Sequence, residues 1–201
     1  MIIDLSVSIT EKTPVYPGDP PVKIETAGVL ERDGYCDHVV TIGTHVGTHI
    51  DAPMHMLAGG KALADYPLER FVGRGVCIDV RSGFDSLYTA TIQKDDILLL
   101  YHGYGEKYHR REYFQEYSAL PPKAADLLIE KHVSMVGSDT CSPDNGADFP
   151  IHRQLLAADV LIIENLTNLG RLVGKSFNVF ALPLALIQDA APARVIAQLT
   201  E

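Results

Sequence analysis

Short apolar runs separated by turn-forming residues recur along the chain, and their lengths predict strands more often than helices. Runs of about four to eight residues without a helical period are typical of strands, and those without polar alternation are typical of buried strands. Strands are predicted at 2–9, 22–29, 38–44, 76–80, 97–101, 133–136, 160–163, 179–182 and 194–199. A proline-rich segment, 14–21, ends the first of them.

Helical periodicity is weaker and occurs twice. Residues 122–132 begin with a proline, which a first helical turn tolerates, and place Ala125, Leu128 and Ile129 at helical spacing. A shorter helix is predicted over 151–158. Several strands before the first helix, followed by mixed strands and helices, predict a mixed α/β or α+β domain with a mixed sheet and few helices.

The segment 87–116 interrupts this pattern. It is rich in tyrosine, histidine and charge around Gly103 and Gly105, and is predicted to include a surface excursion. His102, within it, is more typical of a surface histidine than of a pocket residue. The length of 201 residues suits one domain, 1–201, which buries enough surface to fold without a disulfide or a structural metal.

Composition narrows the function classes. Lysine plus arginine is 17 and aspartate plus glutamate is 26, a net charge of −9 that argues against nucleic-acid binding. Three cysteines without a Cys-x-x-Cys pair favour a reducing, cytoplasmic compartment. No signal peptide is visible, and no apolar run approaches the ~20 residues of a membrane span, so a soluble protein is expected.

The strongest chemical signal lies in residues 45–55. This segment holds three histidines and one aspartate, interrupted by Gly47 and Pro53. Side chains at i and i+2 share one face of a strand, so His49 and Asp51 can converge on one metal ion. The alternative, a polar strand and loop with scattered surface histidines, is disfavoured because ligating groups cluster in this way in metal sites.

The other two histidines of the segment need a bend in the chain. His45 would lie about 13 Å from His49 along a straight strand. It can join the site only if the chain curls, which Gly43 and Gly47 permit. His55 follows the proline turn, which places it near the metal without requiring it to be a ligand.

The pattern His-x-Gly-Thr-His-x-Asp-x-Pro-x-His over 45–55 resembles the signature of the cyclase-like metal-dependent hydrolases, which include bacterial kynurenine formamidase and isatin hydrolase. The resemblance extends over most of the chain. Residues 14–19 are similar to the family's N-terminal aromatic segment, and 137–144 to its Asp-x-x-Ser-x-Asp stretch. His152 and the segment 162–166 resemble its distal metal-binding element. The family's swivelling β/β/α fold and a homodimer or homotetramer are therefore implied.

Residue roles follow from the resemblance, position by position. It implies five metal ligands: His45, His49, Asp51, His152 and Glu164. In the formamidase branch Asp51 and the matching glutamate bridge two metals, and His55 is the catalytic acid/base. Tyr16 stands where characterised formamidases have tryptophan, which this chain lacks, and is implied to contact the substrate.

Independent support for the distal residues is thinner. Glu164 ends the apolar run 160–163, where a carboxylate is costly to bury unless it is paired or faces a cation. His152, taken alone, is more typical of the surface. Asp139 and Asp144 either orient ligating histidines or form turns.

The expected chemistry is metal-assisted hydrolysis of a small carbonyl substrate: an amide, a formamide or a cyclic amide. Nitrogen and oxygen donors suit Zn²⁺ or Mn²⁺, one or two ions per chain. The metal activates water and polarises the carbonyl, while His55 moves the proton.

Two other functions are open. A non-haem iron oxygenase would use His49, Asp51 and His152 as a 2-His-1-carboxylate site, but it leaves His45, His55 and Glu164 unexplained. A non-catalytic metal-binding protein would have a site that its ligands close, whereas a catalytic site keeps an open position.

Overall fold

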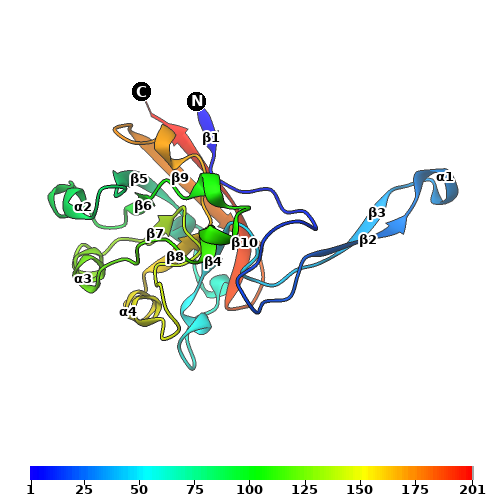
Figure 1. Ribbon diagram of the computed structural model, residues 1–201, viewed down its shortest axis with the longest axis horizontal. Coiled ribbons are helices and arrows are strands. Elements are labelled where there is room, and N and C mark those ends of the chain that lie inside the picture. Colours follow the sequence, from blue (N-terminus) through cyan, green and yellow to red (C-terminus); the bar gives the residue numbers. More distant parts are fainter. Residues whose placement is uncertain (201) are drawn as a thin grey trace.

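Seven strands of the main sheet close into a barrel within residues 1–200, the part of the chain that the computed structural model describes (Figure 1). The strands of the molecule are β1 (Ile2–Asp4), β2 (Lys23–Gly28), β3 (Asp37–Thr41), β4 (His49–Asp51), β5 (Val72–Asp79), β6 (Ile97–Tyr101), β7 (Met135–Ser138), β8 (Leu161–Glu164), β9 (Phe177–Pro183) and β10 (Ala190–Leu199). The main sheet has the order β1-β10-β4-β8-β7-β6-β5-β9, and β9 also pairs with β10, which closes the ring. β1 lies outside the ring, on β10.

The barrel has a parallel half and an antiparallel half. β5, β6, β7 and β8 run parallel, whereas β4, β9 and β10 pair antiparallel with their neighbours. The helices are α1 (Leu30–Asp33), α2 (Asp85–Thr89), α3 (Pro122–Glu130) and α4 (Pro150–Ala157). α2, α3 and α4 cover the outer face of the parallel half, as crossovers between parallel strands do (Figure 1). The predicted mixed α+β class with few helices is confirmed.

The parallel strands separate two hydrophobic cores, one inside the barrel and one beneath the helices. On β6, Ile97 and Leu99 point into the barrel, while Leu98 and Leu100 pack beneath the helices. A strand that is buried on both faces reads as a continuous apolar run, which is why 97–101 was predicted at its observed bounds.

The observed bounds of other strands differ from the predicted bounds where pairing with a distant strand sets them. The strand predicted at 2–9 ends at Asp4, and only an isolated bridge at Ser6 continues it. β10 begins four residues before the predicted 194–199, because Pro192 lies opposite His49 on β4 although proline weakens the strand signal. The helices α1 and α2 are too short for a periodic signal and were not predicted.

The segment 87–116 is less superficial than predicted. Tyr108 follows a 3-10 turn at Gly105–Lys107 and Tyr113 lies in the next one, and both are buried with Tyr117 around Cys141. Burial of these tyrosine rings beside the barrel stabilises the irregular segment, so its own aromatic cluster anchors the excursion.

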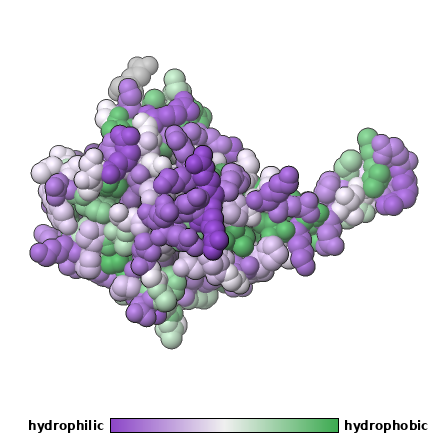
Figure 2. Space-filling view, viewed as in Figure 1, coloured by the Kyte–Doolittle hydropathy of each residue, from purple (hydrophilic) through white to green (hydrophobic). Residues whose placement is uncertain are grey.

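β2 and β3 form a separate two-stranded hairpin that projects from the barrel, with α1 at its tip (Figure 1). Every residue of β3 is exposed. A two-stranded hairpin alone is at most marginally stable in water. On this arm hydrophobic residues lie on the surface beside hydrophilic ones (Figure 2). In the described part of the chain, no helix has the length and apolar character needed to cross a membrane.

Gly60 gives a test of how tightly the turn after β4 is packed. A Cβ at this position would lie 2.4 Å from the carbonyl carbon of Pro53 and 2.6 Å from the amide nitrogen of Met54. Gly60→Ala is therefore expected to lower the free energy of unfolding by about 1–3 kcal/mol, the usual cost of overpacking. Gly43→Ala is the control: its nearest neighbour would be 3.8 Å away, and its unfolding curve should match the wild type. Equal denaturation midpoints for both variants would contradict the packing seen at Gly60.

Candidate metal centre

Strand pairing brings the central carboxylates and histidines together. β4 carries His49 and Asp51, and β8 pairs with it so that His49 lies directly opposite Glu164. Directly opposed residues in an antiparallel pair have Cβ atoms roughly 5 Å apart, so their side chains share one space. His152 reaches the same space from α4, whose axis packs against β8.

His45 enters from a turn rather than from the strand. The predicted strand 38–44 ends at Thr41, and the chain then curls, with Gly47 in the left-handed region at φ 67°. The curl brings the ring centroids of His45 and His49 to 5.0 Å, far closer than a straight strand allows. The requirement for a bend at this place is thus met.

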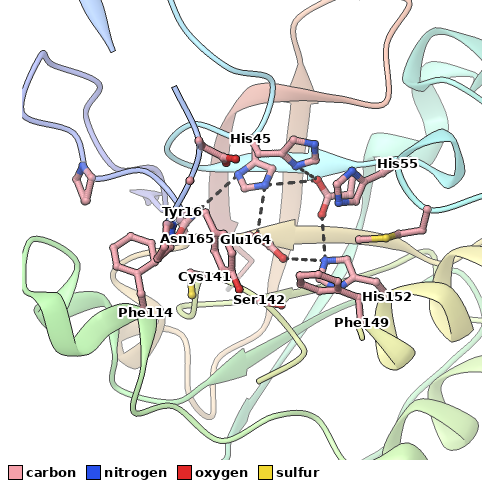
Figure 3. Close-up of a pocket in the computed structure, with 17 residues that line it drawn as sticks. Tyr16, His45, His55, Phe114, Cys141, Ser142, Phe149, His152, Glu164 and Asn165 are labelled. Atoms are coloured by element: carbon pink, nitrogen blue, oxygen red, sulfur yellow. Dashed lines mark hydrogen bonds and ion pairs between the residues drawn. The ribbon is translucent and has the colours of Figure 1, made fainter. Parts of the chain in front are cut away.

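The imidazole nitrogens surround two carboxylates (Figure 3). Asp51 Oδ1 lies 2.9 Å from His45 Nδ1 and 3.4 Å from His49 Nε2, and Asp51 Oδ2 lies 3.7 Å from His152 Nε2. Glu164 Oε2 lies 3.4 Å from His49 Nε2, and its Oε1 lies 3.1 Å from His152 Nε2. Asp51 is fully buried and Glu164 nearly so.

Each of these three histidines has its outer nitrogen held by an acceptor. His49 Nδ1–H donates to the carbonyl of Gly47 at 2.8 Å, and His152 Nδ1 lies 2.7 Å from Asp144 Oδ2. His45 Nε2 lies 3.0 Å from Asp189 Oδ2. Metal-binding histidines are held in this way, because the outer bond fixes the tautomer and aims the other nitrogen at the ion.

Three of the atoms that face the centre of the cluster have no hydrogen-bond partner among the described residues. Within residues 1–200, His49 Nε2 and both carboxylate oxygens of Asp51 are buried without a hydrogen bond. Buried polar atoms are normally paired, and these three belong to residues whose donor atoms lie close together. A divalent cation satisfies all three at once, so the residues present fit a metal ion.

The donors form two groups that share one carboxylate. His49, Asp51 and Glu164 make one group, and His45, Asp51 and His55 make the other; within each group the donor atoms lie within 4.8 Å of one another. Two adjacent groups joined by a carboxylate suit either one ion or a bridged pair. The geometry also places His55 among possible donors, so its acid/base role stays a prediction.

The close packing of imidazoles and carboxylates shifts the pKa values of these residues. Burial lowers the pKa of His45, but the carboxylates of Asp51 and Asp189 outweigh it and raise this pKa to about 10. Burial also lowers the pKa of His152, but the neighbouring carboxylates of Asp144, Asp51 and Glu164 outweigh it and raise this pKa to about 12. Burial would raise the pKa of Asp51, yet the surrounding histidines hold it well below its usual value. Without a cation, protons on imidazole supply the positive charge that the carboxylates require.

Metal binding is therefore expected to release protons. His45 and His152 carry protons at neutral pH, since their pKa values are raised, and a ligating nitrogen must be free of its proton. The apparent affinity for Zn²⁺ should rise with pH below pH 10, by about tenfold per pH unit for each proton displaced. Titration calorimetry in buffers of different ionisation enthalpy measures this number. Binding with no proton release would contradict the assigned ligands.

A pocket of about 450 Å³ opens over the carboxylates. Tyr16 and Phe114 form one side of it, with ring centroids 6.3 Å apart, and His55 lies on the opposite side (Figure 3). Phe149 stacks edge-on against His152 at 5.7 Å. An apolar, aromatic wall facing a cluster of polar donors is typical of a small-molecule site that leaves the metal accessible.

Two alternatives left open by the sequence are settled by contacts. Asp144 orients a histidine, because its carboxylate bonds His152, whereas Asp139 accepts backbone N–H groups of His102 and Tyr104 and so shapes a loop. His102 itself is half-buried against Phe84 and does not line this pocket.

Two polar residues beside the histidines, Asp189 and Asn165, were not predicted. Asp189 lies between His45 and His55, at 3.0 and 3.4 Å. Asn165 adopts a left-handed backbone at φ 58° and donates from Nδ2 to the carbonyl of Gly47 at 2.8 Å. Asn165 follows a predicted ligand in sequence and could have been suspected; Asp189 carries no local signal, because only the barrel brings it near residue 45.

The chain is similar to known proteins over most of its length. The Cyclase family model matches residues 3–145, more than half of the chain. The kynurenine formamidase of Salinibacter ruber is 30% identical over 204 residues, covering 97% of this chain and 96% of that protein.

Solved structures give the same picture of the fold. One described as a potential metal-dependent hydrolase with cyclase activity is 29% identical, with a TM-score of 0.82 over 98% of this chain and 96% of that one. Isatin hydrolase A from Labrenzia aggregata superimposes with a TM-score of 0.88 over 100% of this chain and 94% of that one. Its 23% identity shows a common fold and no more.

Proposed function

Since this chain belongs to the Cyclase family, we propose that it is a metal-dependent hydrolase that cleaves the C–N bond of an amide, a formamide or a cyclic amide. One observation carries the proposal: three histidines with their outer nitrogens held turn their inner nitrogens toward two buried carboxylates at the base of a pocket. This donor set suits one or two Zn²⁺ or Mn²⁺ ions.

The side chains of the proposed site have two kinds of role, metal binding and contact with the reacting groups. Five side chains would hold the metal: His45, His49, Asp51, His152 and Glu164. A bound divalent ion makes water a nucleophile near neutral pH and polarises the substrate carbonyl. His55 takes the proton of the water and delivers it to the leaving nitrogen. Tyr16 and Phe114 contact the substrate and keep bulk water from the reacting groups.

Metal analysis and a substrate screen test the proposal. Purified protein should contain one or two divalent ions per chain, and a chelator should abolish activity. The Zn²⁺- and Mn²⁺-loaded forms should then be assayed with N-formylkynurenine, isatin and simple cyclic amides, without oxygen or reductant. Hydrolysis under these conditions excludes an oxygenase. Less than about 0.1 ion per chain after growth with added metal would contradict the proposal, because even a weak site fills when metal is plentiful.

Tyr16 is expected to bind substrate rather than metal. Tyr16→Ala should raise KM by about 2- to 10-fold, the worth of one aromatic contact, and leave the metal content unchanged. Tyr16→Phe keeps the ring and should keep KM. Unchanged kinetics in Tyr16→Ala would return the segment 14–21 to the role of a rigid surface loop.

We also propose that the protein assembles as a homodimer or homotetramer. The projecting arm supports this, because it has no core of its own and exposes Val29, Leu30, Tyr35, Val39 and Val40. A second copy of the chain offers the same surface in return, as closed symmetric oligomers require. Light scattering at micromolar concentration tests the proposal: Val40→Lys should lower the mass, and a monomeric wild type would overturn it.

A further inference from the structure

Asp189 is held at a fixed place between two strands. It immediately precedes β10, and its carbonyl accepts a hydrogen bond from the amide of Ala52 at 2.8 Å. The next residue, Ala190, lies opposite Asp51 in the β4–β10 pairing. The backbone of Asp189 is therefore anchored where β4 ends and the 3-10 turn Pro53–His55 begins.

The side chain of Asp189 meets two imidazoles. Its Oδ2 lies 3.0 Å from His45 Nε2 and 3.4 Å from His55 Nδ1, and the two rings are 4.1 Å apart between centroids. Within residues 1–200 these are its ion pairs; its exposed neighbours on the loop before β10 add none. An aspartate whose side chain is 30% exposed but aimed inward at two histidines is not an ordinary surface ion pair.

The two contacts have different chemical consequences. When neutral His45 donates from Nε2 to Asp189, it keeps a lone pair on Nδ1. This is the nitrogen that lies 2.9 Å from Asp51. A neutral His55 that donates from Nδ1 keeps its lone pair on Nε2, the nitrogen needed to accept a proton in the pocket that His55 lines. The same arrangement, a carboxylate behind an imidazole, recurs at Asp144 and His152.

We propose that Asp189 is a positioning residue that acts through both histidines at once. It directs Nδ1 of His45 to the metal and Nε2 of His55 to the proton transfer, so one carboxylate couples the metal site to the acid/base. The inference rests on the proposed function and extends it to a residue outside the five ligands. A base that a third group orients is the general design of activated water or nucleophile sites.

Three variants test the proposal on the full-length protein. Asp189→Ala removes both contacts, and Asp189→Asn keeps one acceptor oxygen but loses the charge. Asp159→Asn is the matched control, because Asp159 is also a partly exposed, ion-paired aspartate but pairs with Lys61. Thermal unfolding of all three identifies any loss of the fold.

The first readout needs no substrate. Competition with a chromogenic chelator should show Zn²⁺ binding to Asp189→Ala about 10- to 100-fold weaker than to the wild type, with Asp189→Asn between them. Imidazole ¹⁵N spectra of the protein should show His55 protonated on Nδ1 in the wild type and on Nε2 in Asp189→Ala. A merely structural role would move neither the affinity nor the tautomer.

The second readout uses the best substrate of the screen. At saturating metal, kcat of Asp189→Ala should fall about 10- to 100-fold while KM changes by less than about threefold. Wild-type affinity, tautomer and kcat in a folded Asp189→Ala would overturn the proposal. A wild type that binds metal and hydrolyses nothing would contradict the proposed function instead, and the affinity and tautomer measurements would still decide the role of Asp189.

Discussion

Replacing His55 by alanine is expected to leave the metal in place and to lower kcat by about 10²–10⁴-fold, the usual worth of a positioned acid/base. His55 follows the turn that begins at Pro53, and its ring is about one-quarter exposed to the pocket, whereas His49 is buried beneath it. A bound divalent ion would still lower the pKa of water without His55, so the residual activity of the variant should rise with pH. Steady-state kinetics and elemental analysis on the same preparation measure both quantities.

Two other histidines serve as controls for this result. His49→Ala should lose the metal itself, because Nε2 of His49 faces both carboxylates. His102→Ala should keep metal and kcat, since His102 is half-buried outside the pocket. Because the donor atoms of His55, His45 and Asp51 lie within 4.8 Å, a ligand role has to be tested directly. Equal metal loss in the His55 and His49 variants would make His55 a ligand, and full activity would remove it from the reaction.

Asp51→Asn is expected to abolish metal binding and, with it, activity. Asp51 belongs to both donor groups, and its carboxylate faces His45, His49 and His152. A residue that only orients a ligand is worth about 10- to 100-fold in metal affinity, so the loss of a carboxylate shared by both donor groups should weaken binding by more than about 100-fold. The isosteric amide preserves volume, so the loss reports charge and donor strength rather than a cavity. Chelator competition and elemental analysis give the affinity and the metal content.

A buried aspartate outside the centre controls for the stability effect. Asp96 is buried and paired with Arg74 on β5, so Asp96→Asn should also lose stability but keep its metal. If both variants retain metal, Asp51 is not a ligand. If both lose it, metal loss follows from unfolding, and the assignment of Asp51 would need the folded fraction of each variant at the temperature of the assay.

Local pattern was sufficient for the elements whose stability is local or whose burial is complete. β6 and the helices α3 and α4 were predicted to within about two residues, because an apolar run or a helical period needs no knowledge of neighbours. The cluster at 45–55 was likewise visible, since His49 and Asp51 share a strand face by geometry alone.

Everything that depends on pairing between distant segments was decided by the tertiary structure. The barrel closes because β9 pairs with both β5 and β10, and β10 starts at Ala190 because its first three residues pair with β4. His152 looked like a surface histidine in sequence; it joins the centre because α4 packs against β8.

By itself the sequence determined the types of donor side chain, their clustering at 45–55, the aromatic residue Tyr16 and a mixed α+β fold. The tertiary structure alone decided which nitrogen of each histidine faces inward, that Asp144 orients a ligand while Asp139 shapes a loop, and that Asp189 stands behind His45 and His55. The physical reason is the sequence distance over which each feature is encoded. Residue type and short-range periodicity are carried by a few adjacent positions, whereas a hydrogen bond between residues 144 apart exists only once strand register has brought them together.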